Sequence, residues 1–97
     1  MTISKEVLEA IETELQYQKD KWGEDKQQSF PGFLKIMEGE LEEAGEAWLK
    51  DIYKPRQTAL EEVVQVVATG IACLEKYGTE GWPVSTDDRR QYRVNDD

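Results

Sequence analysis

The glutamates between positions 38 and 50 are the residues whose types and spacing best suit chemistry. The segment EGELEEAGEAWLK carries five glutamates within nine residues. On a helix, residues three or four apart share a face, so Glu43 and Glu46 project together, and Glu42 and Glu46 do so on a neighbouring line. Because like charges at this spacing repel, we expect a positive charge to compensate for them.

A second polar pair lies within the most apolar segment of the chain. The run EEVVQV places Glu62 three residues before Gln65, among valines. If the two segments form an antiparallel helical hairpin through the short KPRQT turn, the first glutamate pair can face Glu62 and Gln65 across the interface. Hard divalent cations such as Mg²⁺, or alternatively Mn²⁺, prefer oxygen ligands of this kind. The pattern predicts a metal site with the ligands Glu43, Glu46, Glu62 and Gln65.

The acidic segment also has an ordinary interpretation. Glutamate favours exposed helix surfaces, and spacings of three and four arise often by chance in an acidic chain. Two features favour a site: the glutamates flank an apolar stripe, and the second polar pair lies in the most hydrophobic segment. The chain has no histidine, so histidine bases, Cys/His zinc sites and Ser-His-Asp triads are excluded for its residues. Catalysis by this chain would depend on carboxylates.

Three helices are expected to position these side chains, over about residues 4–21, 33–54 and 59–78. Apolar residues recur at helical spacing in each; Pro31 can open the second helix, and Pro55 breaks the pattern after Tyr53, in the turn before the third. The valines of the third segment would also suit a strand, but its length and acidic start favour a helix. The stripe along the second helix consists of Leu34, Met37, Leu41, Ala44, Trp48 and Ile52. This spacing predicts that Trp48 is a core residue.

Composition limits the size of the protein and its partners. Ninety-seven residues suffice for a single domain, 1–97, with residues 79–97 as a partly ordered tail. The core is thin at this size, so a second subunit would help to complete it. A net charge of −9 argues against a nucleic-acid polymer or a membrane as partner. The single cysteine, Cys73, and the lack of an apolar signal core suit the cytoplasm.

The motifs resemble those of a known family. The sequences EEAGEA at 42–47 and EEVVQV at 61–66 resemble the EExxE and ExxD motifs of the MazG-like, all-α nucleoside triphosphate pyrophosphatases. The early KWG at 21–23 also fits small single-domain members, and the resemblance spans about residues 15–78. The three main helices, with a short C-terminal helix that Ser85 or Thr86 could cap, give an all-α antiparallel bundle, and the resemblance implies that it is completed as a homodimer or homotetramer. The resemblance also implies Mg²⁺-dependent cleavage of an NTP or dNTP to the monophosphate and pyrophosphate.

By position in the motifs, the resemblance implies roles for individual residues. Glu43 and Glu46 match the ligand pair of the first motif, Glu42 its leading glutamate, and Glu62 the first acid of the second motif. The resemblance makes these four glutamates the candidate catalytic residues. The chain departs from the family at Gln65, where an aspartate is expected, because an amide has no charge and cannot act as a base. The alternative hypothesis is therefore a catalytically weak or inactive helical module that binds a nucleotide or a metal, or acts as a regulatory interaction partner.

Basic and aromatic residues near the motifs are candidates for substrate binding. Lys54 and Arg56 lie in the turn between the motif helices, and Lys21 precedes Trp22 in the KWG segment. Cationic side chains can bind phosphate groups, and a tryptophan can stack on a base. Solvated lysines and arginines are the common alternative, and spacing alone favours a core position for Trp22.

Overall fold

The computed structural model describes residues 2–23 and 28–81 as three α-helices. They are α1 (Lys5–Trp22), α2 (Phe30–Lys50) and α3 (Pro55–Tyr77), with no strand among the described residues. The predicted all-α fold is confirmed at this level. The expected short C-terminal helix lies outside the described residues.

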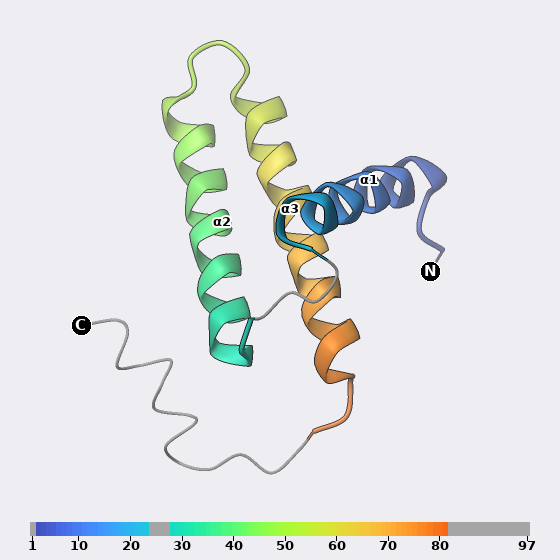
Figure 1. Ribbon diagram of the computed structural model, residues 1–97. Coiled ribbons are helices and arrows are strands. Elements are labelled where there is room, and N and C mark those ends of the chain that lie inside the picture. Colours follow the sequence, from blue (N-terminus) through green and yellow to red (C-terminus); the bar gives the residue numbers. More distant parts are fainter. Residues whose placement is uncertain (1, 24–27, 82–97) are drawn as a thin grey trace, which may run out of the picture.

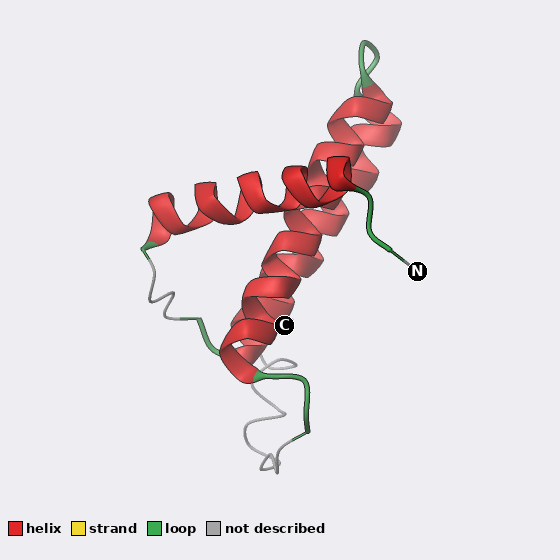
Figure 2. Ribbon diagram, turned by 90° about the vertical axis from the view of Figure 1, so that its right-hand side faces the viewer, coloured by secondary structure: helices red, strands yellow, loops and turns green. Residues whose placement is uncertain are grey.

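The α2 and α3 helices form an antiparallel hairpin, and α1 crosses α3 (Figure 1). Turned by 90°, the hairpin is seen edge-on with α1 on one side of it (Figure 2). Within the described residues, α1 packs against α3 and makes no comparable contact with α2. None of the described helices combines the length and apolarity needed to span a bilayer.

Local signals explain where the helices begin. Ser4 caps α1, because its hydroxyl accepts a hydrogen bond from the Val7 amide at 3.2 Å. Ser29 caps α2 in the same way through the Gly32 amide at 3.1 Å, and Pro31 occupies the first turn. The α2 helix therefore begins about three residues before the predicted start. The α3 helix begins four residues early for a related reason, since its first residue is proline.

The turn between α2 and α3 is organised by one carboxylate. Asp51 accepts hydrogen bonds from the amides of Tyr53 and Lys54, at 2.9 and 3.0 Å, and from the Thr58 hydroxyl at 2.7 Å. These bonds hold the pKa of Asp51 below its usual value, the Lys54 amide contributing most. The turn sets the register in which α2 and α3 pair.

The core lies along the lines where the helices meet. Its buried apolar residues are Ile11, Phe33, Ala44, Ala68 and Cys73. At the end opposite the turn, the Tyr77 ring meets Phe30 and Phe33 edge-on, with ring centroids 5.7 and 6.2 Å apart. The Tyr77 hydroxyl also donates to the Gln28 carbonyl at 3.1 Å. Aromatic packing therefore closes the lower end of the hairpin shown in Figure 1.

The predicted stripe along α2 is only partly correct. Trp48 is 60% exposed and Ile52 is 82% exposed, so the predicted core position of Trp48 is wrong within this chain. The line that packs inward contains Phe33, Met37, Glu40, Ala44 and Ala47. Most of its residues lie one position before those of the predicted stripe, which corresponds to a rotation of about 100° around the helix axis. Periodicity alone could not distinguish these two neighbouring lines, because both carry apolar residues at helical spacing.

Candidate metal centre

Glu62 is the centre of an acidic cluster formed by three helices. It shares a face of α3 with two buried residues, Thr69 and Cys73, and its own side chain is partly buried. Its Oε2 atom is buried without a hydrogen-bond partner. Burial raises the pKa of Glu62, followed in size by the effects of three other carboxylates, Glu43, Glu40 and Glu14. The acidic cluster thus comprises Glu14, Glu40, Glu43 and Glu62.

The hairpin register explains why Glu43 and Glu62 meet. Glu43 lies seven positions before the last residue of α2, and Glu62 lies seven positions after the first residue of α3. Both are therefore about two helical turns from the connection fixed by Asp51. Their carboxyl groups are close enough to share a hydrogen bond when one is protonated, which contributes to the raised pKa of Glu62. Glu40 lies about one turn from Glu43 on the same side of α2.

The α1 helix contributes Glu14 through a buried polar contact. The Nε2 atom of Gln18 donates to the Glu14 Oε2 atom and to the Thr69 hydroxyl, both at 3.3 Å. Gln18 is only 4% exposed, and Thr69 is fully buried. The Oε1 atom of Gln18 is buried with no hydrogen-bond donor near it. A buried amide oxygen without a partner is costly, so this part of the interface is polar and incompletely satisfied.

The chemistry of the acidic cluster suits a hard divalent cation. Among the described residues, no three His, Cys, Asp or Glu side chains are arranged to enclose a metal ion. Mg²⁺, however, is commonly bound by one or two carboxylates and keeps waters and substrate phosphates as its other ligands. Glu43 and Glu62 provide such a pair, and the unpartnered Oε2 atom of Glu62 provides a free acceptor. The residues therefore fit Mg²⁺ in number and type.

Of the four predicted metal ligands, Glu43 and Glu62 are brought together, and Glu46 and Gln65 are not among the groups that raise the pKa of Glu62. Glu43 acts on Glu62 although its side chain is exposed. Glu46 is exposed too, with its Oε1 atom 3.9 Å from Lys50 Nζ. Gln65 is partly buried on α3, one turn after Glu62. Glu42, predicted as a catalytic residue, is exposed on α2.

Two members of the acidic cluster were not predicted from the sequence. Glu40 could have been found from its spacing, because it lies three residues before Glu43 and four before the buried Ala44. No local signal marks Glu14, whose place depends on how α1 crosses α3.

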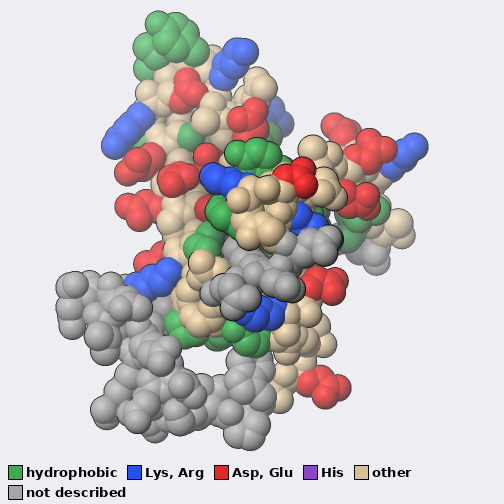
Figure 3. Space-filling model, in the orientation of Figure 1, with side chains coloured by type: hydrophobic (Ala, Val, Ile, Leu, Met, Phe, Trp, Pro, Cys, Tyr) green, Lys and Arg blue, Asp and Glu red, His purple; other side chains and the backbone are tan. Residues whose placement is uncertain are grey.

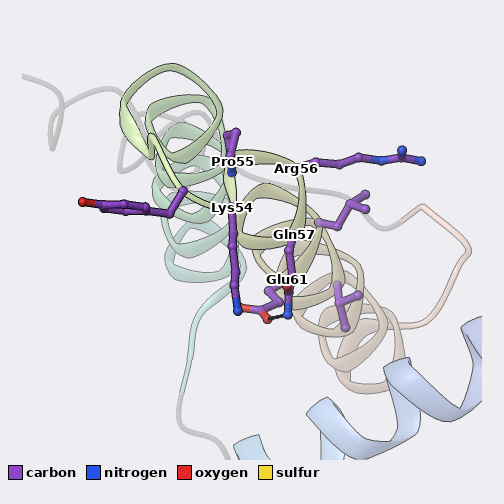
Figure 4. Close-up of a pocket in the computed structure, with 8 residues that line it drawn as sticks. Lys54, Pro55, Arg56, Gln57 and Glu61 are labelled. Carbon is purple, nitrogen blue, oxygen red and sulfur yellow. Dashed lines mark hydrogen bonds between the residues drawn. The ribbon is translucent and has the colours of Figure 1, made fainter.

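Lys54 and Arg56 line an open hollow of about 690 Å³ at the start of α3. Figure 4 shows Lys54 extending toward Gln57 and Glu61, while Arg56 extends away from them. The Gln57 Nε2 atom donates to Glu61 at 3.4 Å. Neighbouring residues on a helix point about 100° apart, so the hollow beside Glu61 and the acidic cluster around Glu62 face different directions.

Lys21 and Trp22 lie at the exposed end of α1. The Lys21 Nζ atom is 5.1 Å from the centroid of the Trp22 ring and 5.9 Å from that of Tyr17. Trp22 is 44% exposed, so the core position suggested by its spacing is wrong within this chain. An exposed ring beside a cation remains suited to stacking.

Charge on the face seen in Figure 3 is mostly negative, with Asp and Glu side chains spread over α1 and the outer edge of α2.

In comparisons with known proteins, no family model, curated protein or solved structure matches this chain. The resemblance to MazG-like enzymes therefore stays a prediction, and function has to be argued from the acidic cluster.

Proposed function

We propose that this chain is a divalent-metal-dependent pyrophosphatase that cleaves an NTP or dNTP to the monophosphate and pyrophosphate. The observation that carries the proposal is the partly buried Glu62 carboxyl beside Glu43, with Glu40 and Glu14 close enough to raise its pKa further. Carboxylates held this close without a counter-charge destabilise a fold, so an arrangement of this kind favours a cation-binding role.

In this proposal, Glu43 and Glu62 hold Mg²⁺ or Mn²⁺. The ion, when bound, would offset triphosphate charge and lower the pKa of an attacking water. Glu62 would bind the ion as a carboxylate, and the other carboxylates of the acidic cluster, Glu40 and Glu14, are the candidates for accepting the proton of the attacking water. Each of these steps uses a carboxylate of the acidic cluster.

The remaining predicted residues take secondary roles in the proposal. Gln65 would supply a neutral oxygen one turn after Glu62, and Glu46 would have to leave Lys50 to reach the ion. Glu42 is not among the carboxylates that act on Glu62, so the proposal gives it no direct role. Of the four exposed residues predicted to contact the substrate, Lys21 and Trp22 keep this role in the proposal, whereas Lys54 and Arg56 line a hollow that faces another direction than the acidic cluster.

The proposal includes a homodimer or homotetramer, acting in the cytoplasm. Large apolar side chains are exposed along α2 and α3, and α1 covers the hairpin from one side only (Figure 2). Large apolar side chains that are exposed next to one another commonly mark a protein–protein interface. The exposed residues that a second copy would cover include Leu41, Trp48, Leu60, Val63 and Val67.

Pyrophosphate release from a panel of NTPs and dNTPs, with Mg²⁺ or Mn²⁺, tests the activity. We expect Glu43→Gln and Glu62→Gln to lower the rate about 100-fold or more, because each removes a charged ligand. Glu75→Gln is the matched control, since Glu75 is an exposed glutamate of α3 outside the acidic cluster. Equal rates in all four proteins would refute the ligand assignment.

A non-catalytic binding module is the second candidate, and Gln65 favours it. A neutral amide stands where the resemblance implies an aspartate. Metal binding by the parent without pyrophosphate release from any nucleotide would favour this alternative. Activity that arises only in Gln65→Asp would indicate that this one position separates the two functions.

A further inference from the structure

The bend between α2 and α3 carries the most exposed large apolar side chains of the described residues. Leu49, Ile52 and Tyr53 are 80%, 82% and 87% exposed. The bend projects beyond α1 at one end of the hairpin (Figure 1), and apolar side chains gather at this end in Figure 3. We call residues 49–56 the tip of the hairpin. Large apolar side chains exposed together commonly mark an interaction surface.

The tip is positively charged, although the chain as a whole is negatively charged. It has three basic residues, Lys50, Lys54 and Arg56, against one acid, Asp51, which gives a formal charge of +2, whereas the whole chain has −9. All three basic side chains are exposed. The carboxylate of Asp51 accepts the three hydrogen bonds that hold the turn. An apolar tip with basic side chains beside it is complementary to an anionic surface that has an apolar layer beneath it.

The shape of the tip favours a lipid surface over a folded partner. The end of a two-helix hairpin is convex, and the bonds to Asp51 hold its backbone in one conformation. A protein would need a matching cavity to cover such an end, whereas the headgroup layer of a bilayer can adapt to it. Tyrosine favours this layer because its ring has an apolar body and a polar end. Lysine and arginine can keep their charged ends at the headgroups while their stems lie in apolar surroundings.

The acidic remainder of the chain lies far enough from the tip to permit this contact. Glu43 and Glu62 are each seven residues from the helix end at the bend, which is about 10 Å along the helix axis. Exposed charges are largely screened beyond about 8 Å at physiological ionic strength. Acids are spread over α1 and the outer edge of α2 in Figure 3, so other orientations would bring them against the surface. The charge distribution therefore favours contact through the tip.

We propose that the tip docks this protein reversibly on anionic lipid bilayers. Its three apolar side chains insert at the level of the headgroups, and its three basic side chains contact anionic headgroups. The net charge of the whole chain predicts no membrane partner, because it averages the tip with the acidic helices. The cytoplasmic leaflet of a membrane supplies anionic lipids, which suits the proposed location. The inference depends neither on metal binding nor on nucleotide cleavage.

Flotation of the full chain with lipid vesicles tests the docking. The buffer contains EDTA, so that no divalent cation can bridge carboxylates to lipid phosphates, and about 0.15 M salt. We expect the parent to float with vesicles of phosphatidylcholine that contain about one third phosphatidylserine. Binding to phosphatidylcholine alone should be at least about tenfold weaker, because each basic residue near an anionic surface contributes about fivefold to the affinity.

Variants of the tip test its two components separately. Lys54→Gln combined with Arg56→Gln should weaken binding to the anionic vesicles about 25-fold, since two contributions of about fivefold are lost. Ile52→Ser combined with Tyr53→Ser should weaken it about tenfold or more, because the inserted apolar surface is lost. All four side chains are exposed, and circular dichroism would establish that both variants remain helical.

Two matched controls change the same properties away from the tip. Lys5→Gln combined with Lys19→Gln removes the same amount of charge from exposed positions on α1. Leu74→Ser removes a large apolar side chain that is 52% exposed near the opposite end of α3. Both controls should bind the anionic vesicles as the parent does.

A fluorescent label tests whether the tip is the part that enters the lipid. The single cysteine of the chain, Cys73, is buried, so a polarity-sensitive label would react selectively at Ile52→Cys. We expect its emission to shift to shorter wavelength on addition of anionic vesicles. The same label at Glu75→Cys, an exposed position of α3 distant from the bend, should show no shift.

Several results would overturn the docking. They are the absence of flotation of the parent, equal binding to both kinds of vesicle, and equal losses in the tip variants and the controls. Self-association that the tip variants abolish, in a parent that does not float, would identify the tip as a contact between copies instead. Flotation that depends on the tip, in a chain that releases no pyrophosphate, would support the docking and reject the enzymatic function alone.

Discussion

Replacing Glu62 by glutamine should stabilise the metal-free protein at neutral pH. The Glu62 carboxyl is partly buried, and its pKa is raised first by burial and then by Glu43, Glu40 and Glu14. A carboxyl whose pKa is higher in the folded state than in the unfolded state stabilises the fold below its unfolded pKa. That stabilisation is lost as the pH rises through the folded pKa. At neutral pH the charged form therefore weakens the fold, and Glu62→Gln removes this charge.

The size of the effect follows from the environment of the Oε2 atom. Leaving a buried polar group without a partner costs about 1–3 kcal/mol, and more when the group is charged. Glutamine keeps the shape, and its amide can donate to the Glu43 carboxylate, so part of this cost is recovered. We expect a gain of about 1 kcal/mol in the free energy of unfolding, equivalent to a rise in Tm of roughly 4–8 °C for a chain of this size.

Thermal unfolding followed by circular dichroism measures this gain, in buffer with EDTA and at pH values from 4 to 8. The parent should lose stability relative to Glu62→Gln as the pH rises above the usual glutamate pKa of about 4.3. Glu75→Gln, which changes an exposed glutamate on the same helix, should leave Tm nearly unchanged. A lower Tm for Glu62→Gln than for the parent at neutral pH, without metal, would refute the reasoning.

Three further perturbations test other parts of the structure. Asp51→Ala should lower Tm, because the turn loses the acceptor of three hydrogen bonds. Folding lowers the pKa of Asp51, so its carboxylate stabilises the fold above the ordinary aspartate pKa of 3.8. The difference in Tm between parent and variant should therefore shrink as the pH falls through the folded-state pKa of Asp51. Phe33→Ala should cost about 3–5 kcal/mol in urea unfolding, because Phe33 is fully buried against Tyr77, and a cost below 1 kcal/mol would contradict this packing. Trp48→Ser should shift the chain toward the monomer in sedimentation if a second copy covers α2, whereas a monomeric parent would contradict the proposed oligomer.

The ends of the helices have local causes, but the sequence predicted them only to within a few residues. Ser29 and Pro31 define the start of α2, and Gly78 ends α3 with a positive φ of 79° that glycine adopts readily. The predicted helix starts still missed the true ones by a few residues. The apolar pattern identifies the body of a helix more reliably than its first turn.

The acidic cluster could be predicted only in part. The motif spacing and an assumed hairpin were enough to bring Glu43 and Glu62 together. Glu46 was predicted with them, yet it lies beside Lys50 and is not among the carboxylates that raise the pKa of Glu62, because residues at i and i+3 share a face only approximately. Glu14 depends on the crossing of α1 over α3, which is a property of tertiary packing and leaves no local pattern.

The turn held by Asp51 has a consequence for how such a chain can change over evolutionary time. Glu43 and Glu62 are equally far from this turn. Inserting one residue between the turn and either glutamate would rotate that glutamate by about 100° around its helix axis and separate the pair. Insertions between α1 and α2 would leave this distance untouched. Length variation among descendants of this sequence should therefore accumulate before α2 and be purged from the two turns on each side of the hairpin bend.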